Sequence, residues 1–282
     1  MGQVSAAAPF IVGTSEPAPG EAVGEAPCRV VSNEPVNAVY RHLVIVAGPA
    51  ALTARPGQFF NLRAPGAAPV PWPRRPLSVY GVDTAGARVS FLHNCASGGG
   101  TLAALREDDV VHVAGPLGIG FRLDPAWRHV VMLGRGAGLA PLAALARHAR
   151  AGGVDVTAIL SARTADLMMA AAVFAAAGTV VPVLDSDRSG DIENVERIVE
   201  EVIGRRRVDA FFTAGSNRLL HLLKRLGRRH GIPGQVALEQ VMVCAFGPCY
   251  VCVRNFDVDG RRELRRVCID GPVFDLQEAA GV

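Results

Sequence analysis

The sequence predicts a multidomain protein: an antiparallel β-barrel, then a Rossmann-like parallel α/β domain, then a small C-terminal metal-binding module. Three observations predict this order. Short strand-like segments divided by Gly/Pro turns fill the first part of the chain, and apolar strands alternate with helical segments after about residue 124. Four of the six cysteines fall between Cys244 and Cys268. A length of 282 residues is sufficient for two domains and a module.

The barrel is expected over residues 27–123, after an extension at 1–26 that is rich in Ala, Pro, Gly and Glu and has no periodicity. Six segments in this region have the length and composition of strands, and six strands at this spacing favour a small barrel. They are Cys28–Ser32, Val39–Ala47, Gln58–Leu62, Leu77–Asp83, Arg88–His93 and Asp109–Ala114.

The α/β domain is expected over residues 124–233, where continuous apolar strands alternate with helical segments. Such strands are typical of a parallel sheet that is covered on both faces. The expected strands are His129–Leu133, Val154–Leu160, Val180–Leu184 and Val208–Thr213. The expected helices are Leu139–Ala151, Thr164–Ala177, Glu193–Arg206 and Arg218–His230. The turn-rich, cysteine-bearing segment 234–282 is expected to be a separate module.

Composition excludes several classes of protein. Half of the residues are apolar, which argues against disorder. The sequence contains no uninterrupted run of about 18 apolar residues, so no membrane span is predicted. A net charge of +3 with scattered arginines predicts no nucleic-acid partner. Residues 1–20 lack the features of a secretory segment, so we expect a cytoplasmic, reducing location. Clustered thiols in such a compartment are more often metal ligands than disulfides.

The cysteine spacing is the most specific local signal. Cys244, Cys249, Cys252 and Cys268 form a C-x4-C-x2-C-x15-C pattern, which is typical of plant-type [2Fe–2S] sites. Zinc sites more often use paired C-x2-C motifs, so zinc is the less favoured alternative. Cys28 and Cys95 stand alone and are not expected to be ligands.

Three further motifs suit phosphate groups. Gly134, Gly136 and Gly138 lie between an apolar strand and a helix, where a pyrophosphate can approach the backbone and the helix N-terminus. Arg75 and Ser78 on one barrel strand can donate to a phosphate, although a solvated basic turn has the same composition. The segment Ser97–Leu102, with Gly100 and Thr101, offers backbone N–H groups and a hydroxyl, although a flexible linker looks the same.

These motifs occur in an order that resembles a known family, the electron-transfer subunits of NAD-dependent (type B) dihydroorotate dehydrogenases, a branch of the ferredoxin reductase superfamily. The resemblance covers roughly residues 28–276. The motifs that carry it are Arg75-Pro76-Leu77-Ser78, Gly100-Thr101, Gly115–Phe121, Gly134–Leu142 and the cysteine pattern ending in Cys268-Ile269-Asp270-Gly271-Pro272-Val273-Phe274.

The resemblance implies an FAD-binding barrel, a nicotinamide domain and a [2Fe–2S] module. A flavin belongs between the other two redox groups, since it exchanges both hydrides and single electrons. Implied FAD ligands are Arg75 and Ser78 at the phosphate, Pro76 and Leu77 at the flavin, and Gly100 and Thr101 at the pyrophosphate. Gly134, Gly136 and Gly138 are implied at NAD(H), with Asp185 near its adenosine ribose, and the four cysteines at the cluster.

The resemblance also implies a partner, an FMN-containing catalytic oxidoreductase subunit in a hetero-oligomer of pyrimidine biosynthesis. Two alternatives are open: the same module serves another partner, such as a hydrogenase-like, glutamate-synthase-like or other oxidoreductase, or the chain is a non-redox zinc protein. The chain departs from the family pattern at three places. Ala214-Gly215-Ser216 stands where Cys-Gly-Pro is usual, and Arg135 and Ala245 each stand where Gly is usual.

The cofactor is expected to be NADH rather than NADPH. Asp185 and Asp187 follow the third strand of the nicotinamide domain, and carboxylates accept hydrogen bonds from ribose hydroxyls but repel a 2′-phosphate. Arg163, at the end of the preceding strand, is the residue that would pair with that phosphate in the opposite case.

Overall fold

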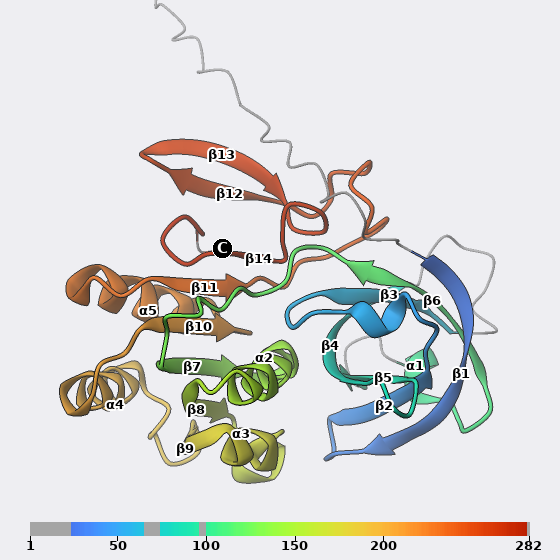
Figure 1. The fold of residues 1–282 in the computed structure, drawn as a ribbon, viewed down its shortest axis with the longest axis horizontal. Coiled ribbons are helices and arrows are strands. Elements are labelled where there is room, and N and C mark those ends of the chain that lie inside the picture. The colour runs from blue at the N-terminus through green and yellow to red at the C-terminus, as the bar shows by residue number, and fades with distance from the viewer. Residues whose placement is uncertain (1–23, 65–73, 96–99, 281–282) are drawn as a thin grey trace, which may run out of the picture.

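A computed structural model describes residues 24–64, 74–95 and 100–280. The first part is a closed antiparallel barrel with the strand order β1-β2-β5-β4-β3-β6 (Figure 1). Its strands are β1 (Gly24–Pro35), β2 (Tyr40–Val46), β3 (Phe59–Arg63), β4 (Arg75–Asp83), β5 (Arg88–Asn94) and β6 (Val110–Leu117). All six strands expected from the sequence are present, and β4 begins two residues early, so that Arg75 and Pro76 lie within it.

Large apolar side chains fill the barrel interior. Phe60 and Phe91 meet edge to face with ring centroids 5.6 Å apart, and Leu43, Ile45 and Leu62 are fully buried around them. The short helix α1 (Gly100–Ala103) and the one-turn helix η1 (Ala51–Thr53) lie outside the strands, and the buried Leu102 of α1 joins the barrel core. Every residue of this core lies between Cys28 and Val113.

The predicted extension at 1–26 lies mostly outside the described residues, which begin at Gly24. Gly24, Glu25 and Ala26 already belong to β1, where they pair with Gly115, Ala114 and Val113 of β6. The strand therefore starts earlier than the Pro- and Gly-rich composition suggested.

The second part is a six-stranded sheet with the order β14-β11-β10-β7-β8-β9, in which only β14 is antiparallel. The strands are β7 (His129–Arg135), β8 (Asp155–Ala162), β9 (Gly178–Leu184), β10 (Ala210–Ala214), β11 (Gly234–Ala237) and β14 (Val273–Asp275). The helices are η2 (Gly136–Gly138), α2 (Leu139–Ala151), η3 (Ala165–Leu167), α3 (Ala171–Ala177), α4 (Ile192–Arg205) and α5 (Asn217–His230). Strand β8 pairs with one side of β7, and β10 pairs with its other side. The topological switch point therefore lies between β7 and β10.

One expected helix is divided. The segment Thr164–Ala177 contains the 3-10 turn η3 and then α3, which starts at Ala171. Ala170 between them has a φ of 58°, and a left-handed residue cannot continue a right-handed helix. The Ala-rich composition therefore gave the right element type and overestimated its length.

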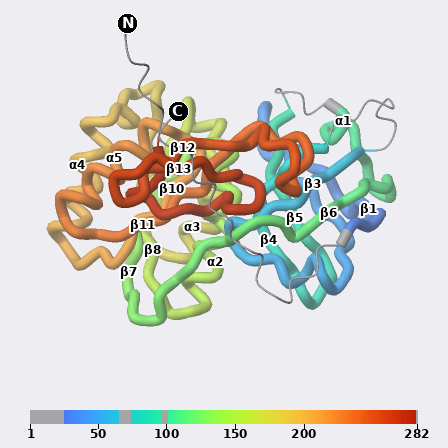
Figure 2. Tube along the Cα trace, turned by 90° about the horizontal axis from the view of Figure 1, so that it is seen from above, coloured from blue at the N-terminus to red at the C-terminus, as the bar shows by residue number. Residues whose placement is uncertain are grey.

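The C-terminal segment lies on top of the parallel sheet and reaches toward the barrel (Figures 1 and 2). Its hairpin, β12 (Val253–Val258) and β13 (Arg261–Arg266), is held by Phe256 and Phe274, whose ring centroids are 4.3 Å apart. The backbone N–H of Ile119, after β6, donates to the carbonyl of Gly271 at 2.5 Å. The domain boundaries at 124–233 and 234–282 stay a prediction, and β11 and β14 from beyond residue 233 complete the nucleotide sheet.

Helix α2 joins the barrel to the α/β domain. The Arg147 guanidinium donates to the carbonyl of Tyr80 at 2.5 Å and lies 4.6 Å from the centroid of the Tyr80 ring. A cation over an aromatic face and a charged hydrogen bond both favour one orientation. This contact fixes the position of β4 relative to the glycine turn that opens α2.

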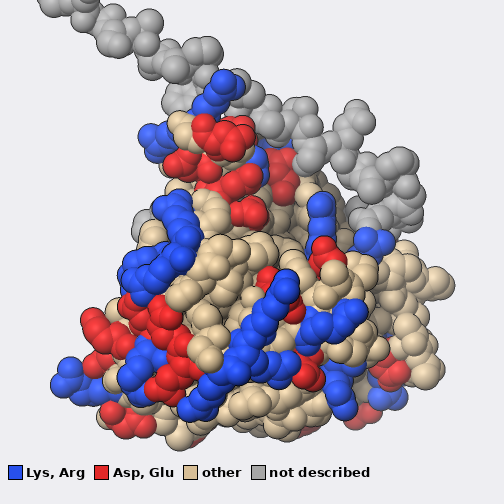
Figure 3. Space-filling model, turned by 60° about the vertical axis from the view of Figure 1, so that its left-hand side comes forward, with Lys and Arg blue, Asp and Glu red and all other residues tan. Residues whose placement is uncertain are grey.

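Charges of both signs intermingle on the face that carries α4 and α5 (Figure 3). Arg225 pairs there with Glu196, and Arg229 pairs with Glu200 at 2.8 Å. Within the described residues, no helix combines the length and apolar composition that a membrane crossing needs.

Candidate functional site

A cavity of about 800 Å³ lies where the barrel, the glycine turn and the C-terminal segment meet. Arg75, Pro76, Leu77 and Ser78 of β4 all line it, so the four barrel residues singled out in the sequence share one site. Ala137 and Ala140, from the turn and the start of α2, line its second side. Residues 238–242, which lead to the first clustered cysteine, line the third side.

Arg74 and Arg75 are adjacent in sequence, and both line the cavity. The Arg74 guanidinium forms an ion pair with Glu25 of β1, and this hydrogen bond lowers the pKa of the Glu25 carboxyl. Arg75 begins β4, opposite Leu62 of β3, and faces the cavity. Both arginines line the cavity, and Arg75, which belongs to the Arg75–Ser78 motif, is the candidate phosphate ligand.

A buried polar chain that sequence reasoning missed ties α1 to the cavity wall. The Asn33 amide nitrogen donates to the carbonyls of Leu102 at 2.9 Å and Leu105 at 3.0 Å. Its amide oxygen is therefore the acceptor toward His93 Nε2, 3.1 Å away, which must carry the proton. His93 lines the cavity, and its Nδ1 has no partner among the described residues. Burial lowers the pKa of His93 to about 4, so the ring is neutral.

Gly100 and Thr101, the candidate pyrophosphate ligands, start α1 beside this chain, and Leu102 lines the cavity. The Asn33 amide fixes the carbonyls at the end of this short helix. The remainder of the expected cradle, Ser97 to Gly99, lies outside the described residues.

The glycine turn packs backbone against backbone. A Cβ on Gly138 would lie 2.4 Å from the carbonyl carbon of Ala214, and one on Gly215 would lie 2.1 Å from the carbonyl oxygen of Arg135. Neither clash is relieved by moving a side chain. The loops after β7 and β10 therefore meet at the switch point, where α/β sheets bind ligands.

Gly136 has a φ of 55°, and a Cβ there would lie 3.0 Å from the Tyr40 hydroxyl of β2. The turn is thus in contact with the barrel, and its residue Ala137 faces the cavity. Gly134, at the end of β7, leaves room for Leu142, whose Cδ1 would be 2.6 Å from a Cβ. Glycine is favoured at position 136 by the positive φ and at position 138 by the close approach of the Ala214 backbone. At position 134 it is favoured by the packing of the Leu142 side chain.

Asp185 lies at the carboxyl edge of the sheet, directly after β9. Its Oδ1 accepts hydrogen bonds from Arg135 Nη1 at 3.1 Å and Arg218 Nη2 at 3.0 Å, and Arg135 Nη2 bonds its Oδ2. Arg135 Nη1 also donates to the Ser161 hydroxyl at the end of β8, at 2.8 Å. The Arg135 hydrogen bond lowers the pKa of the Asp185 carboxyl, and Arg218 adds to the effect. The departure from Gly at position 135 therefore supplies a bidentate partner for Asp185.

The four clustered cysteines form two pairs. Cys244 and Cys249 have sulfurs 3.1 Å apart, and Cys252 and Cys268 have sulfurs 3.2 Å apart. A disulfide needs about 2.05 Å, so both pairs are thiols. The thiol hydrogen bond lowers the pKa of Cys252 and raises that of Cys268, so the pair shares a proton that a bound metal would replace.

Two pairs fit a binuclear cluster, in which each iron takes two thiolates. One zinc ion needs its four ligands around a single point, whereas these sulfurs lie in two pairs. The arrangement therefore favours [2Fe–2S] over the zinc alternative.

The cysteine loop is shaped by left-handed residues. Ala245 has a φ of 64° and Gly247 a φ of 96°, where an added Cβ would lie 2.7 Å from Ile269 Cδ1. The backbone N–H of Phe246 points at Cys244 Sγ, 3.4 Å away. Ala245 thus adopts the conformation for which Gly is the usual residue, and its methyl group is buried.

The two pairs differ in exposure, because Cys252 and Cys268 are buried whereas Cys249 is exposed. Four apolar side chains close to this pair in the sequence are each 45–67% exposed: Val241, Phe246, Tyr250 and Val251, which we call the apolar rim. The Arg266 guanidinium lies 5.2 Å from the centroid of the Tyr250 ring. Large exposed apolar side chains are typical of a surface that binds another molecule.

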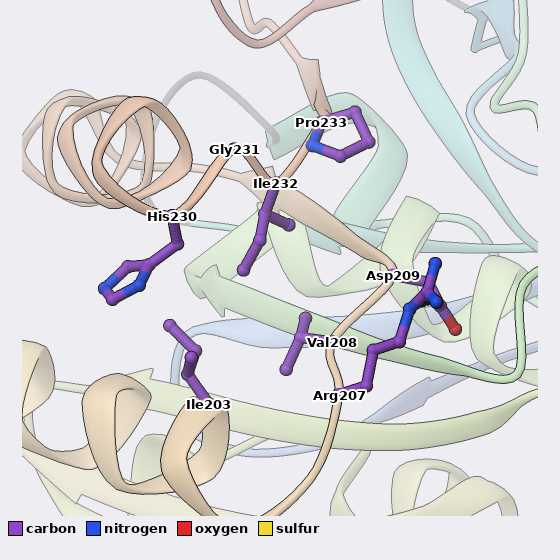
Figure 4. A pocket seen from close by; sticks show the side chains of 8 residues that line it. All are labelled: Ile203, Arg207, Val208, Asp209, His230, Gly231, Ile232 and Pro233. Atoms are coloured by element: carbon purple, nitrogen blue, oxygen red, sulfur yellow. Dashed lines mark ion pairs between the residues drawn. The ribbon is translucent and has the colours of Figure 1, made fainter.

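A second cavity, of about 330 Å³, lies below α5 at the amino edge of the sheet (Figure 4). Ile203, Val208 and Ile232 line it. Asp209 beside it accepts the backbone N–H groups of Arg128 at 2.7 Å and His129 at 3.0 Å, which is a structural role. None of the candidate residues from the sequence lies there.

The chain is similar in sequence to known proteins of one family. Residues 239–279 match the family described as the iron-sulfur cluster binding domain of dihydroorotate dehydrogenase B. The chain is 32% identical over 231 residues to the "Dihydroorotate dehydrogenase B (NAD(+)), electron transfer subunit" of Bacillus cereus strain B4264. That match covers 79% of this chain and 86% of the relative.

Two solved structures share the fold. One is an NADH-dependent reduced ferredoxin-NADP oxidoreductase studied for flavin-based electron bifurcation, with a TM-score of 0.77, 23% identity, and coverage of 92% of this chain and 91% of that one. The other is a ferredoxin NADP+ reductase of Neisseria gonorrhoeae with bound FAD and NADP, with a TM-score of 0.60, 16% identity, and coverage of 73% and 92%. The chain therefore has a ferredoxin-reductase-like fold, and it belongs to the family of electron-transfer subunits of dihydroorotate dehydrogenase B.

Proposed function

We propose that this chain passes electrons between a dihydroorotate-oxidising catalytic subunit and NAD(H), using FAD and a [2Fe–2S] cluster. Oxidation of dihydroorotate to orotate in the partner removes two electrons and two protons from the substrate, and the partner's FMN would accept the electrons. NAD+ gains a hydride, which carries both electrons and one proton, and the second proton is released. The chain thus works in pyrimidine biosynthesis, as an oxidoreductase subunit in a cytoplasmic hetero-oligomer.

A single observation carries this proposal: one cavity touches all three parts of the chain. Arg75 and Ser78 line it from the barrel, Ala137 from the glycine turn, and Met242 from the segment before Cys244. A group held there is next to both the nicotinamide site and the cysteine loop. Two-electron and one-electron carriers need an intermediary that can do both, and bound FAD supplies that chemistry.

The residues of the chain bind and orient the FAD. In this assignment the Arg75 guanidinium and the Ser78 hydroxyl donate to its phosphate, and Pro76 and Leu77 lie against the flavin. Gly100 and Thr101 donate to the pyrophosphate from the start of α1, which Asn33 holds in place.

The glycine turn and the edge of the sheet receive NAD(H). Gly134, Gly136 and Gly138 let the dinucleotide backbone approach the start of α2, and Asp185 lies where the adenosine ribose is expected. Gly136 contacts Tyr40 of the barrel, so this turn brings the nicotinamide end toward the cavity. Ser216 and Ala214, in place of the usual Cys-Gly-Pro, leave Gly215 and its close approach to Arg135 unchanged.

The cysteine module holds the cluster and meets the partner. Cys244, Cys249, Cys252 and Cys268 are its ligands in this assignment, one pair buried and the other next to the apolar rim. The rim residues are close to Cys244 and Cys249 in the sequence, so a catalytic subunit that covers them would bring its flavin close to the cluster. The occupant we assign to this surface is therefore the FMN-containing catalytic subunit.

Reconstitution tests the function. The chain, purified with FAD and cluster, is mixed with the dihydroorotate dehydrogenase catalytic subunit of the same organism, and dihydroorotate-dependent reduction of NAD+ is followed at 340 nm. We expect NADH formation only when both proteins are present, and loss of complex formation in a Phe246→Asp, Tyr250→Asp variant. A chain that is reduced by NADH but neither binds this subunit nor supports the reaction belongs to a different complex.

A further inference from the structure

The carboxyl edge of the nucleotide sheet carries a charge cluster drawn from four elements. Arg135 ends β7, Ser161 lies near the end of β8, Asp185 follows β9, and Arg218 lies in the first turn of α5. Asp185 receives three of the hydrogen bonds described above, and Ser161 receives one. The side chains of Arg135, Asp185 and Arg218 are 23%, 37% and 44% exposed, so a solute reaches them.

Without Asp185, this cluster would be a phosphate site. Two guanidinium groups and a hydroxyl within one hydrogen-bonded group are the donors that bind phosphate most strongly. Asp185 accepts hydrogen bonds from the guanidiniums of both Arg135 and Arg218. Its negative charge reduces the net charge of the cluster from +2 to +1. Its lowered pKa keeps the carboxylate ionised at neutral pH.

The position of the cluster connects it with the cofactor. Dinucleotides lie across the carboxyl ends of the strands at the switch point, with the adenosine ribose beyond the end of the second strand. Here the second strand is β8, whose Ser161 hydroxyl accepts from Arg135. NADH and NADPH differ only in a phosphate on that ribose.

We propose that Asp185 selects NADH by holding Arg135 and Arg218 as a built-in substitute for the 2′-phosphate. This inference rests on the proposed NAD(H) function and adds the residues that decide between the two cofactors. The selection acts through the arginines, because a 2′-phosphate would have to displace the carboxylate that they already bind. The role differs from simple repulsion, in which Asp185 would act without either guanidinium.

Ligand binding by the holoprotein tests this proposal without turnover. Calorimetric affinities for 2′,5′-ADP and 5′-ADP are measured for the unmodified protein, Asp185→Asn and the double variant Asp185→Asn, Arg135→Ala. We expect Asp185→Asn to bind 2′,5′-ADP about tenfold tighter, the scale of one hydrogen bond to a charged group, with little change for 5′-ADP. The ratio of kcat/KM for NADPH to that for NADH is expected to rise in parallel.

The double variant distinguishes selection through the arginines from direct repulsion of the phosphate by Asp185. If the arginines accept the phosphate, removing Arg135 cancels most of the gain. A gain that persists without Arg135 shows direct repulsion by Asp185 and overturns the proposal. Weaker 5′-ADP binding in Asp185→Asn, without any gain for 2′,5′-ADP, overturns it as well, because Asp185 then binds the ribose itself.

Asp155→Asn is the matched control, since Asp155 also pairs with an arginine, Arg206, but at the opposite end of β8. It is expected to change neither affinity. FAD and cluster absorbance establish that each variant is folded and loaded. NADH bleaching of the unmodified protein tests the proposed function separately: a protein that NADH reduces, whose Asp185→Asn variant gains nothing, contradicts only this inference.

Discussion

The barrel and the cysteine loop are stabilised in different ways. Barrel strands bury Phe60, Phe91 and Leu62 in a shared interior, which holds them together without any bound group. Residues 238–252 contain neither helix nor strand, and the apolar rim side chains point into solvent. Ala245 and Cys252 of this segment reach the core of the sheet, and its thiols approach one another in two pairs. The barrel is thus ordered by burial throughout, whereas we expect the exposed part of the loop to depend on a bound metal.

The largest expected effect is loss of the cluster from the cysteine loop while the barrel stays folded. Cys252→Ser and Cys268→Ser each remove a ligand from the buried pair, so we expect loss of nearly all cluster iron. Cys28→Ser and Cys95→Ser, which change cysteines of the barrel region, are expected to keep it. Iron per chain and the visible spectrum are the measurements. Normal iron in Cys268→Ser would overturn the ligand assignment.

Removing the metal from the unmodified protein sharpens the same contrast. Metal binding is coupled to local folding, so chelation should expose Phe246 and Tyr250 to chymotrypsin and speed cleavage there by more than about tenfold. The barrel should keep its thermal unfolding midpoint, because its core does not include the loop. Equal destabilisation of both regions would show that the barrel also depends on the cluster.

The difference between the two regions also explains how far the sequence was informative. Alternating apolar residues and glycine turns predicted all six barrel strands, since local pattern and burial agree there. Spacing predicted which cysteines cluster, but not that Cys244 pairs with Cys249 and Cys252 with Cys268. That pairing depends on the left-handed backbone at Ala245 and Gly247.

Contacts between distant residues were beyond sequence reasoning. Arg135 and Asp185 are fifty positions apart, and Asn33 and His93 are sixty apart. A buried Asn and His have no pattern of their own, and the Arg at a usual Gly position was the only signal of the charge cluster. The strands β11 and β14 joined the nucleotide sheet because tertiary pairing, not composition, decides sheet membership.

Acid should weaken the barrel through a buried group. The pKa of His93 is lowered to about 4 in the folded state, against about 6.5 when unfolded. Between these values the unfolded chain binds a proton that the folded one does not, so the free energy of unfolding falls as pH falls, by up to about 3 kcal/mol. His93→Gln, which retains an N–H donor for Asn33, should lose this part of the pH dependence. Denaturant unfolding at pH 7 and pH 4.5 compares the two proteins, and an identical pH dependence would exclude His93 as the cause.

The smallest predicted effect concerns FAD binding to the barrel. Arg75→Ala should weaken FAD binding by about 2 kcal/mol, or roughly thirtyfold, the scale of a charged hydrogen bond. Arg29→Ala is the control and should cost little, because Arg29 of β1 pairs with Asp108 and does not line the cavity. Fluorescence titration of the apoprotein measures both, and mass spectrometry of the released flavin should identify FAD. Release of FMN alone, or an equal loss in both variants, would contradict the assignment of Arg75.

Anaerobic titration of the purified chain with NADH tests the central claim most directly, that FAD and a [2Fe–2S] cluster form one electron path. Flavin and iron are first counted in the same sample, and the account predicts about two iron atoms per FAD. Visible absorbance should then show bleaching of both groups, while the Cys268→Ser variant shows bleaching of the flavin alone. A colourless protein that contains zinc, or a cluster that stays oxidised after NADH has bleached the flavin, would contradict the account.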